Sequence, residues 1–222
     1  MRTRLKDRVL PTYTRGEERF NMISHIVGGA IGIAALALCI VRSALHHNGF
    51  GLAGSIVFGV SMILLYTMSS IYHGLREGMA KKVLQVLDHC TIYVLIAGTY
   101  TPILLSAMRP IDPVASWVLL GVIWALAAVA ITLTAIDLHK FRVFSMICYI
   151  GMGWTIIFKV PLLIEAIGWG GFWLILLGGV SYTAGAVLYG MGRTKRYMHS
   201  IFHLFVILGS VLHTIAILLF VL

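Results

Sequence analysis

Long apolar stretches, interrupted by glycine, proline or charged residues, run through nearly the whole chain. The apolar residues follow one another continuously instead of alternating with polar ones, which favours membrane-spanning helices over the strands of a barrel. Seven stretches reach the length of about 20 residues that a helix needs to cross a bilayer. The expected spans are Met22–Leu45, Leu52–His73, Val83–Ala107, Val114–Ile136, Val143–Ile164, Trp169–Tyr189 and Met198–Leu222. The pattern predicts an all-α fold, a seven-transmembrane helix bundle.

The composition excludes a water-soluble globular protein. Of the 222 residues, 59% are hydrophobic and only 11% are charged, whereas soluble domains have about a quarter charged residues. Seven spans leave no room for a separate soluble domain. We expect two parts, a cytoplasmic N-terminal arm (residues 1–20) and the seven-helix transmembrane domain (residues 21–222). The apolar run after the arm is too long for a cleaved signal peptide, so it is interpreted as a retained first span.

The basic residues gather on one side of the predicted spans. Fourteen of the 17 lie in the arm or after the second, fourth and sixth spans: Arg2, Arg4, Lys6, Arg8, Arg15, Arg19, Arg76, Lys81, Lys82, Lys140, Arg142, Arg193, Lys195 and Arg196. Only Arg42, Arg109 and Lys159 fall on the other side. Because basic loops stay in the cytoplasm, this predicts a cytoplasmic N-terminus and an extracytoplasmic C-terminus. The net charge of +9 is therefore an orientation signal, and no nucleic-acid partner is expected.

Ionisable residues inside spans are costly and mark candidate sites. Ser69 and His73 lie four residues apart at the cytoplasmic end of the second span, and Asp88 lies about one turn into the third. His199 and His203 are again four apart, at the start of the seventh span. Residues four apart share a helix face. Three spans thus place polar side chains at one depth, near the cytoplasmic side.

This combination of residue types is typical of a metal site. Two histidines at positions i and i+4 can hold one ion from a single helix, and a third from a neighbouring helix gives three nitrogen ligands. Such a set with an open fourth position is a catalytic zinc arrangement. Asp88 would accept a hydrogen bond from the zinc-bound water or act as its base, and Ser69 would orient a ligand or the substrate. The spacing alone leaves a structural polar contact between helices as the alternative.

Other polar residues in or near the spans have simpler interpretations. Glu18, Asn21 and His25 share one face at the start of the first span, where they support the same site or form a helix-entry cap or a structural network. His89 and His213 are interpreted as hydrogen-bonding residues between helices. Asp137 lies at a span end and is expected to be solvated.

Four motifs resemble those of a known family across nearly the whole chain. They are EERFNMISH (residues 17–25), SSIYH ending at His73, LDHCTIYVLIAGTYTP (residues 87–102) and HSIFH (residues 199–203). Together they are similar to the bacterial hemolysin III-like family of the progestin and adipoQ receptor (PAQR) superfamily. The resemblance implies a seven-helix fold with a cytoplasmic N-terminus. It also implies a zinc ion on His73, His199 and His203, with Asp88 and Ser69 in the same conserved pattern.

The resemblance also implies an activity, since the wider family is similar to alkaline ceramidases. We therefore expect a zinc-dependent hydrolase of a lipid amide or ester, embedded in the plasma (inner) membrane as a multi-pass protein with a membrane lipid as substrate or ligand. Two alternatives remain open. One is a membrane homeostasis or sensor protein in which zinc is structural, and the other is a pore-forming cytolysin.

Overall fold

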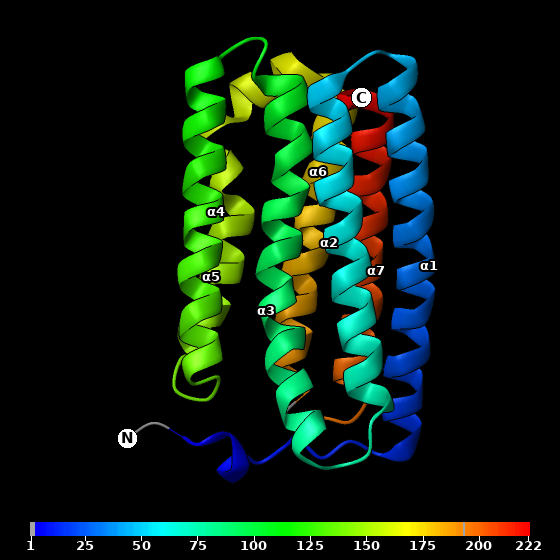
Figure 1. Ribbon diagram of the computed structural model, residues 1–222, viewed down its shortest axis with the longest axis vertical. Coiled ribbons are helices and arrows are strands. Elements are labelled where there is room, and N and C mark those ends of the chain that lie inside the picture. Colours follow the sequence, from blue (N-terminus) through cyan, green and yellow to red (C-terminus); the bar gives the residue numbers. More distant parts are fainter. Residues whose placement is uncertain (1–2, 193) are drawn as a thin grey trace.

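The computed structural model describes residues 3–192 and 194–222, so Arg2 and Arg193 of the basic set lie outside the described residues. The described chain is almost entirely helical, and its long helices stand side by side in a bundle (Figure 1). The α-helices are α1 (Arg15–Leu45), α2 (Gly49–Gly74), α3 (Met79–Pro102), α4 (Pro113–Ile136), α5 (Arg142–Trp154), α6 (Val160–Met191) and α7 (Met198–Ala216). Short 3₁₀ or π segments are η1 (Leu5–Asp7), η2 (Ile103–Met108), η3 (Thr155–Lys159) and η4 (Ile217–Val221). The predicted all-α class is confirmed.

The predicted arm extended to residue 20, but α1 already begins at Arg15. The described residues before it, 3–14, are called the arm from here on, and they run across the end of the bundle at which α1 begins (Figure 1). We call this the arm end, and the opposite end, where α7 finishes, the far end. The Lys82 ammonium donates a hydrogen bond to the Lys6 carbonyl at 2.6 Å. Where the arm meets α1, Thr14 and Glu17 form a capping box that satisfies backbone groups of the first turn. These contacts fix the path of the arm beneath the helices.

Asp137 anchors the start of the arm, contrary to its interpretation as a solvated loop residue. It is only 1% exposed, and it accepts a hydrogen bond from the Thr3 amide at 2.7 Å. The amides of His139 and Lys140 also donate to its carboxylate, each at 3.1 Å. Burial opposes ionisation, but these hydrogen bonds outweigh it and lower the pKa of Asp137. The solvation interpretation is wrong because the sequence gives no sign that the arm folds back onto this loop.

Six helical stretches of the described chain are long and apolar enough to cross a membrane. Five of them contain α1, α2, α3, α4 and α7, and the sixth is the 50-residue stretch Arg142–Met191, which contains both α5 and α6. Large apolar side chains point outward from the bundle, as Ile33 (61% exposed) and Val118 (58% exposed) illustrate. A surface of this kind is stable against lipid and not against water.

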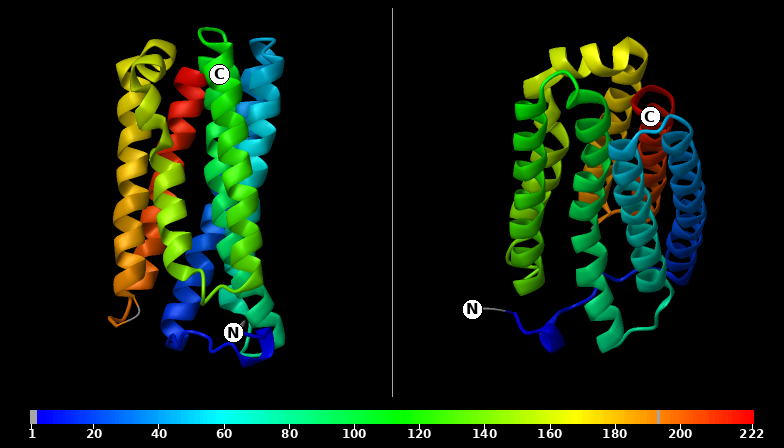
Figure 2. Two further views of the ribbon diagram at one scale, coloured as in Figure 1. Left: turned by 90° about the vertical axis from the view of Figure 1, so that its left-hand side faces the viewer. Right: turned by 45° about the horizontal axis from the view of Figure 1, so that its top comes forward.

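The predicted fifth and sixth spans have different boundaries in the structure. The helix expected over Val143–Ile164 stops at Trp154. Within α6, Gly168 has φ 64° and ψ 174°, a conformation that interrupts the helix and that glycine adopts at little cost. Figure 2 shows the yellow segment after α5 lying across the far end before the chain returns along α6. Gly168 lies in the predicted gap between Ile164 and Trp169, but hydropathy does not reveal the earlier end of α5 at Trp154, because the chain stays apolar there.

Glycines allow α1, α2 and α3 to pack closely against one another. A Cβ atom at Gly28 of α1 would lie 2.6 Å from the ring of Tyr66 on α2, and one at Gly54 of α2 would lie 2.6 Å from Pro102. Small residues at such crossings are a general feature of helices packed in membranes. The close approach brings the last turn of α2 next to α1 and α3.

Candidate metal centre

Three buried histidines from two helices meet at the arm end. His73 lies in the last turn of α2, whereas His199 and His203 lie in the first turns of α7. The Nε2 atoms of His73 and His199 are 3.4 Å apart, and those of His199 and His203 are 3.1 Å apart. In the described residues, one ligand atom from each histidine lies within 4.8 Å of the others. The structure therefore brings together the three predicted metal ligands.

The spacing of the nitrogen atoms fits a single small metal ion. Zn–N bonds of about 2.0–2.1 Å at a tetrahedral angle place two ligand nitrogens about 3.4 Å apart. The separations of 3.4 Å and 3.1 Å are close to this value. The shorter separation is between His199 and His203, which lie one turn apart on the same face of α7. The donor set is soft enough for a transition metal and lacks the oxygen atoms that calcium or magnesium requires.

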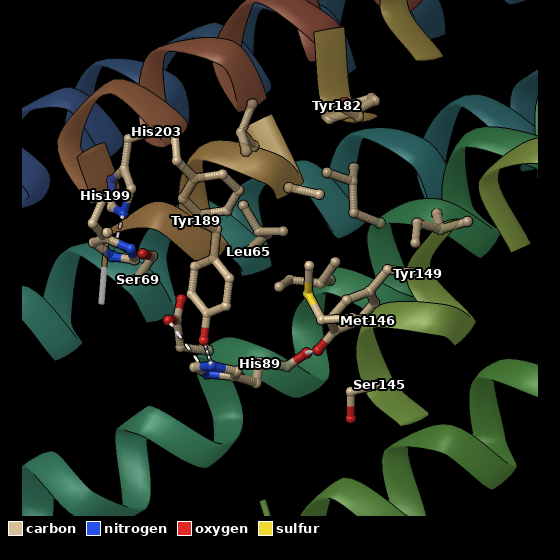
Figure 3. Close-up of a pocket in the computed structure, with 18 of the residues that line it drawn as sticks. Leu65, Ser69, His89, Ser145, Met146, Tyr149, Tyr182, Tyr189, His199 and His203 are labelled. Atoms are coloured by element: carbon tan, nitrogen blue, oxygen red, sulfur yellow. Dashed lines mark hydrogen bonds and ion pairs between the residues drawn. The ribbon is translucent and has the colours of Figure 1, made fainter. Parts of the chain in front are cut away.

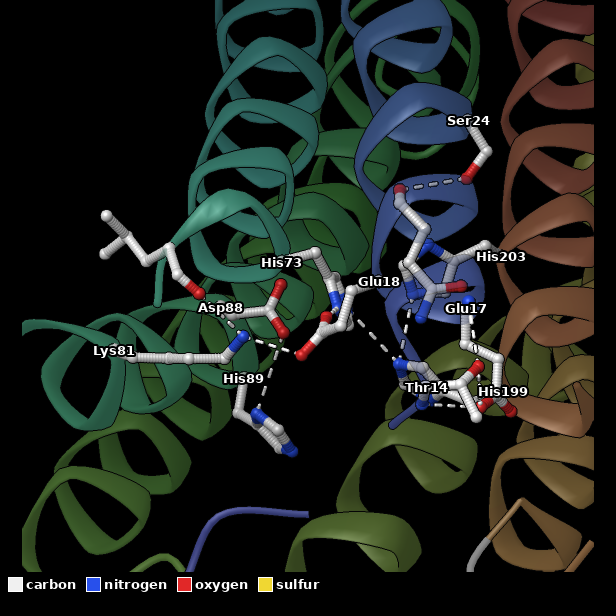
Figure 4. A network of polar contacts seen from close by, with 12 residues as sticks. Thr14, Glu17, Glu18, Ser24, His73, Lys81, Asp88, His89, His199 and His203 are labelled. Carbon is white, nitrogen blue, oxygen red and sulfur yellow. Dashed lines mark hydrogen bonds and ion pairs between the residues drawn. The ribbon is translucent and has the colours of Figure 1, made fainter. Parts of the chain in front are cut away.

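A carboxylate on α1 orients the first ligand. His73 Nδ1 lies 2.6 Å from Glu18 Oε2, and Lys81 Nζ donates to Glu18 Oε1, also at 2.6 Å (Figure 4). Because a carboxylate only accepts hydrogen bonds, the Nδ1 atom of His73 carries the proton. The Nε2 atom on the opposite side of the ring faces the other two histidines. A metal-binding histidine commonly has such a carboxylate partner.

The predicted supporting face of α1 also reaches the third ligand. The rings of His25 and His203 stack, with centroids 3.7 Å apart and an angle of 20° between their planes. Asn21 is fully buried one turn earlier. The side-chain nitrogen and oxygen atoms of Asn21 and both ring nitrogens of His25 have no hydrogen-bond partner among the described residues. The sequence left a cap or structural network as an equal alternative, and the structure favours support of the site.

Asp88 and Ser69 lie beside the cluster but are not part of the ligand group. Both line one cavity together with His199 and His203, and the Ser69 hydroxyl is a hydrogen-bond partner of the Asp88 carboxylate. Asp88 Oδ2 also lies 3.9 Å from His89 Nδ1. A carboxylate beside a metal centre, open to a cavity, has the position of a general base.

The cavity extends from the histidines into the apolar interior. Its volume is about 550 Å³, within the range of about 300–1,000 Å³ that is usual for small-molecule sites. Figure 3 shows Ser69, His199 and His203 at one end, and Tyr182 farther along toward the far end. Its walls are mainly apolar side chains of α3, α5 and α6. The cavity thus has polar groups at one end and a mainly apolar length beyond them.

Tyr13, in the arm, contacts the metal centre, which the sequence did not predict. Its ring stacks on His199 with centroids 4.9 Å apart and an interplanar angle of 18°. Burial, reinforced by the nearby Tyr189 and Glu18, raises the pKa of the Tyr13 hydroxyl well above its usual value, so the phenol stays neutral. Lys81, which contacts Glu18, was likewise expected only as a charged loop residue. Neither Tyr13 nor Lys81 belongs to a periodic pattern that could have revealed its contact with the site.

The remaining intramembrane histidines make contacts between helices, as predicted. His89 Nε2 lies 3.1 Å from the Tyr189 hydroxyl on α6, and His213 Nε2 lies 3.0 Å from the Ile175 carbonyl, also on α6. Neither belongs to the group of potential metal ligands found in the described residues.

Comparison with known proteins covers almost the whole chain. A sequence model of the family described as "Haemolysin-III related" matches residues 13–214. The chain is 38% identical to "Hemolysin-3" of Bacillus cereus over 206 residues, which are 93% of this chain and 92% of that protein. It is 36% identical to "Hemolysin-3 homolog" of Bacillus subtilis over 198 residues, 89% and 91% of the two chains. It is also 27% identical to the human "Monocyte to macrophage differentiation factor" over 169 residues, 72% and 67% of the two chains.

Proposed function

Because the chain belongs to the haemolysin III-related family of multi-pass membrane proteins, within the PAQR superfamily, we propose that it is a zinc-dependent hydrolase of a lipid amide or ester. The observation that carries the proposal is the group of three buried histidine nitrogens beside a carboxylate and a mainly apolar cavity. We place the protein in the plasma membrane.

The proposed topology has seven crossings, with the arm end in the cytoplasm. The 50-residue stretch Arg142–Met191 crosses twice in this proposal, because it is far longer than the roughly 20 residues of one crossing and breaks at Gly168. The arm end carries most of the basic residues. The metal centre then opens toward the cytoplasmic half of the bilayer.

His73, His199 and His203 would hold the zinc ion. When bound, zinc supplies Lewis-acid activation of a water molecule and of the substrate carbonyl. Glu18 keeps the His73 proton on Nδ1 and thereby keeps Nε2 available.

Asp88 performs the proton transfers in this proposal. A carboxylate oxygen of Asp88 takes a proton from the attacking water while the water oxygen bonds to the carbonyl carbon. As the carbon–nitrogen or carbon–oxygen bond breaks, Asp88 returns the proton to the leaving atom. Ser69 holds the carboxylate in place by its hydrogen bond. The apolar cavity accommodates the acyl chain and keeps bulk water out.

The test compares lipid turnover with metal content in the same samples. Wild-type protein in detergent is incubated with defined ceramides, acyl esters and total membrane lipid, and released fatty acid is measured. Asp88→Asn should keep its zinc yet lose about 100-fold or more of the turnover. Asp7→Asn, an exposed substitution in η1, is the matched control. Equal turnover by wild type and Asp88→Asn, or none by wild type, contradicts the hydrolase.

A structural metal is the second candidate, because the same cluster joins α2 to α7 and, through Glu18, to α1. In a homeostasis or sensor protein of this kind, metal removal lowers the unfolding temperature while no lipid product forms in any extract. A third candidate, cytolysis, is suggested by the name of the Bacillus cereus relative. Dye release from liposomes that is unaffected by His199→Ala would favour it.

A further inference from the structure

Each histidine of the metal centre has a neighbour in the arm or in α1 that contacts its ring, although His199 also contacts the rings of Tyr189 and Phe202. The pairs are Glu18 with His73, His25 with His203 and Tyr13 with His199. All three neighbours come from one segment, residues 13–25, which joins the arm to the first turns of α1. Two of them were expected from the helical spacing of α1, whereas Tyr13 precedes the helix.

We propose that Tyr13 is a positioning residue of the metal centre. Its ring lies nearly parallel to the His199 ring and so directs His199 Nε2 at the position shared with the other two histidines. The centre is complete only when the arm is docked. The proposal rests on the metal site of the proposed function, but not on the hydrolytic reaction.

One carboxylate fixes the backbone on both sides of this ring pair. Glu17 Oε2 accepts hydrogen bonds from the Thr14 amide at 2.9 Å and the Thr14 hydroxyl at 2.8 Å. Glu17 Oε1 accepts from the Tyr197 amide at 2.7 Å. Thr14 follows Tyr13 directly, and Tyr197 lies two residues before His199. Glu17, which is buried, thus holds the start of α1 and the start of α7 in register.

Contacts along the arm fix the path that brings Tyr13 to His199. Arg8 is only 4% exposed, and its Nε and Nη1 atoms have no hydrogen-bond partner among the described residues. Burial of these two unpaired nitrogen atoms opposes docking of the arm. The hydrogen bonds at Asp137 and Lys82 offset this cost, and the ring pair then forms at the end of the arm nearest the metal centre.

Cobalt(II) is a direct probe, because its visible spectrum reports ligand geometry. The full-length protein in detergent is stripped of metal and titrated with Co²⁺, and the visible absorption band and the Kd are recorded. Tyr13→Ala should change the band and weaken binding about 10–100-fold, the usual effect of losing a group that orients a ligand. Tyr13→Phe should behave as wild type, because the ring and not the hydroxyl makes the stack. Glu17→Ala should resemble Tyr13→Ala.

Leu10→Ala, which shortens another arm side chain that lines the cavity, is the matched control and should bind Co²⁺ as wild type does. If Tyr13→Ala does not fold, Tyr13→Leu replaces it, since leucine has bulk without a planar ring. An unchanged spectrum and Kd in the ring-deleted variant overturns the proposal, as does a Tyr13→Phe variant as weak as Tyr13→Ala. Wild-type protein that binds no Co²⁺ overturns this proposal and the metal site together, whereas absent lipid turnover affects only the hydrolase.

Discussion

Helix α7 carries histidines in two settings that differ in what their ring nitrogens face. At the arm end, His199 and His203 direct their Nε2 atoms at each other and at His73. About 15 Å deeper, His213 has its Nε2 atom 3.0 Å from the Ile175 carbonyl. A carbonyl only accepts, so this Nε2 carries a proton and cannot bind a metal. His199 and His203 are buried, whereas His213 is half-buried and lines the same cavity.

The two settings differ in whether the ring nitrogens converge and whether a negative charge lies nearby. The arm-end cluster has Glu18, which Lys81 also contacts. His213 instead packs edge-on against Tyr182 at 5.4 Å and fits into the space left by Gly178. Its role is to join α6 to α7. Substitution of the arm-end histidines should therefore release the metal, whereas substitution of His213 should not. Metal removal should likewise affect the arm-end histidines and not His213.

The largest expected effect is loss of the metal when the arm-end histidines are substituted, but not when His213 is substituted. His199→Ala combined with His203→Ala removes two of three ligands, so bound zinc should fall from about one ion per chain to background in elemental analysis. His213→Leu should retain the full content. If the His213 variant also loses the metal in folded protein, the distinction between the two groups is wrong.

Glu18→Gln should have the next largest effect. The amide no longer provides a negative charge to hold the proton on His73 Nδ1, so zinc affinity should fall about 10–100-fold. Competition with a fluorescent chelator measures the change. Glu165→Gln, at an exposed position of α6, is the control and should leave the affinity unchanged. An unaltered affinity in Glu18→Gln would show that His73 does not depend on this carboxylate.

Gly178→Ala tests the packing of the deeper histidine. The new Cβ would lie 2.3 Å from His213 Cδ2, and such overpacking typically costs about 1–3 kcal/mol of unfolding free energy. The unfolding temperature in detergent should fall while zinc content stays the same. At the neighbouring Gly179 an added Cβ meets nothing within 4 Å, so Gly179→Ala should not destabilise the protein. Equal behaviour of the two variants would contradict the described contact.

The smallest expected effect is that acid loosens the contact between the arm and Asp137. The pKa of Asp137 is lowered in the folded protein, so its contribution to stability is present above its unfolded pKa of about 3.9. That contribution is lost as the pH falls through the lower folded value, because the unfolded state then binds the proton more readily. Proteolysis of the arm should increase in this range for wild type. Asp137→Asn should show raised proteolysis at neutral pH and little further change in acid.

Much of this arrangement follows from the sequence. Hydropathy predicts most of the helices, and the i, i+4 spacing with the common depth predicts His73, His199 and His203. Glu18 shares a helix face with His25, which predicted either support of the site or a cap or structural network. The break at Gly168 lies in the predicted gap between the fifth and sixth spans, whereas the end of α5 at Trp154 was missed because it lies inside an apolar run. Tyr13 and Lys81 were missed because their contacts depend on how the arm and the start of α3 pack against the bundle, which no local pattern encodes.

X-ray absorption spectroscopy of the zinc-loaded protein tests the central claim most directly, because it reports the atoms bound to the metal. The account predicts a shell containing three imidazole nitrogens at about 2.0–2.1 Å and a further light atom. The imidazole signal should disappear in the double His199→Ala, His203→Ala variant and persist in His213→Leu. A sulfur-containing shell, a shell of oxygen atoms alone, or no bound zinc would contradict it.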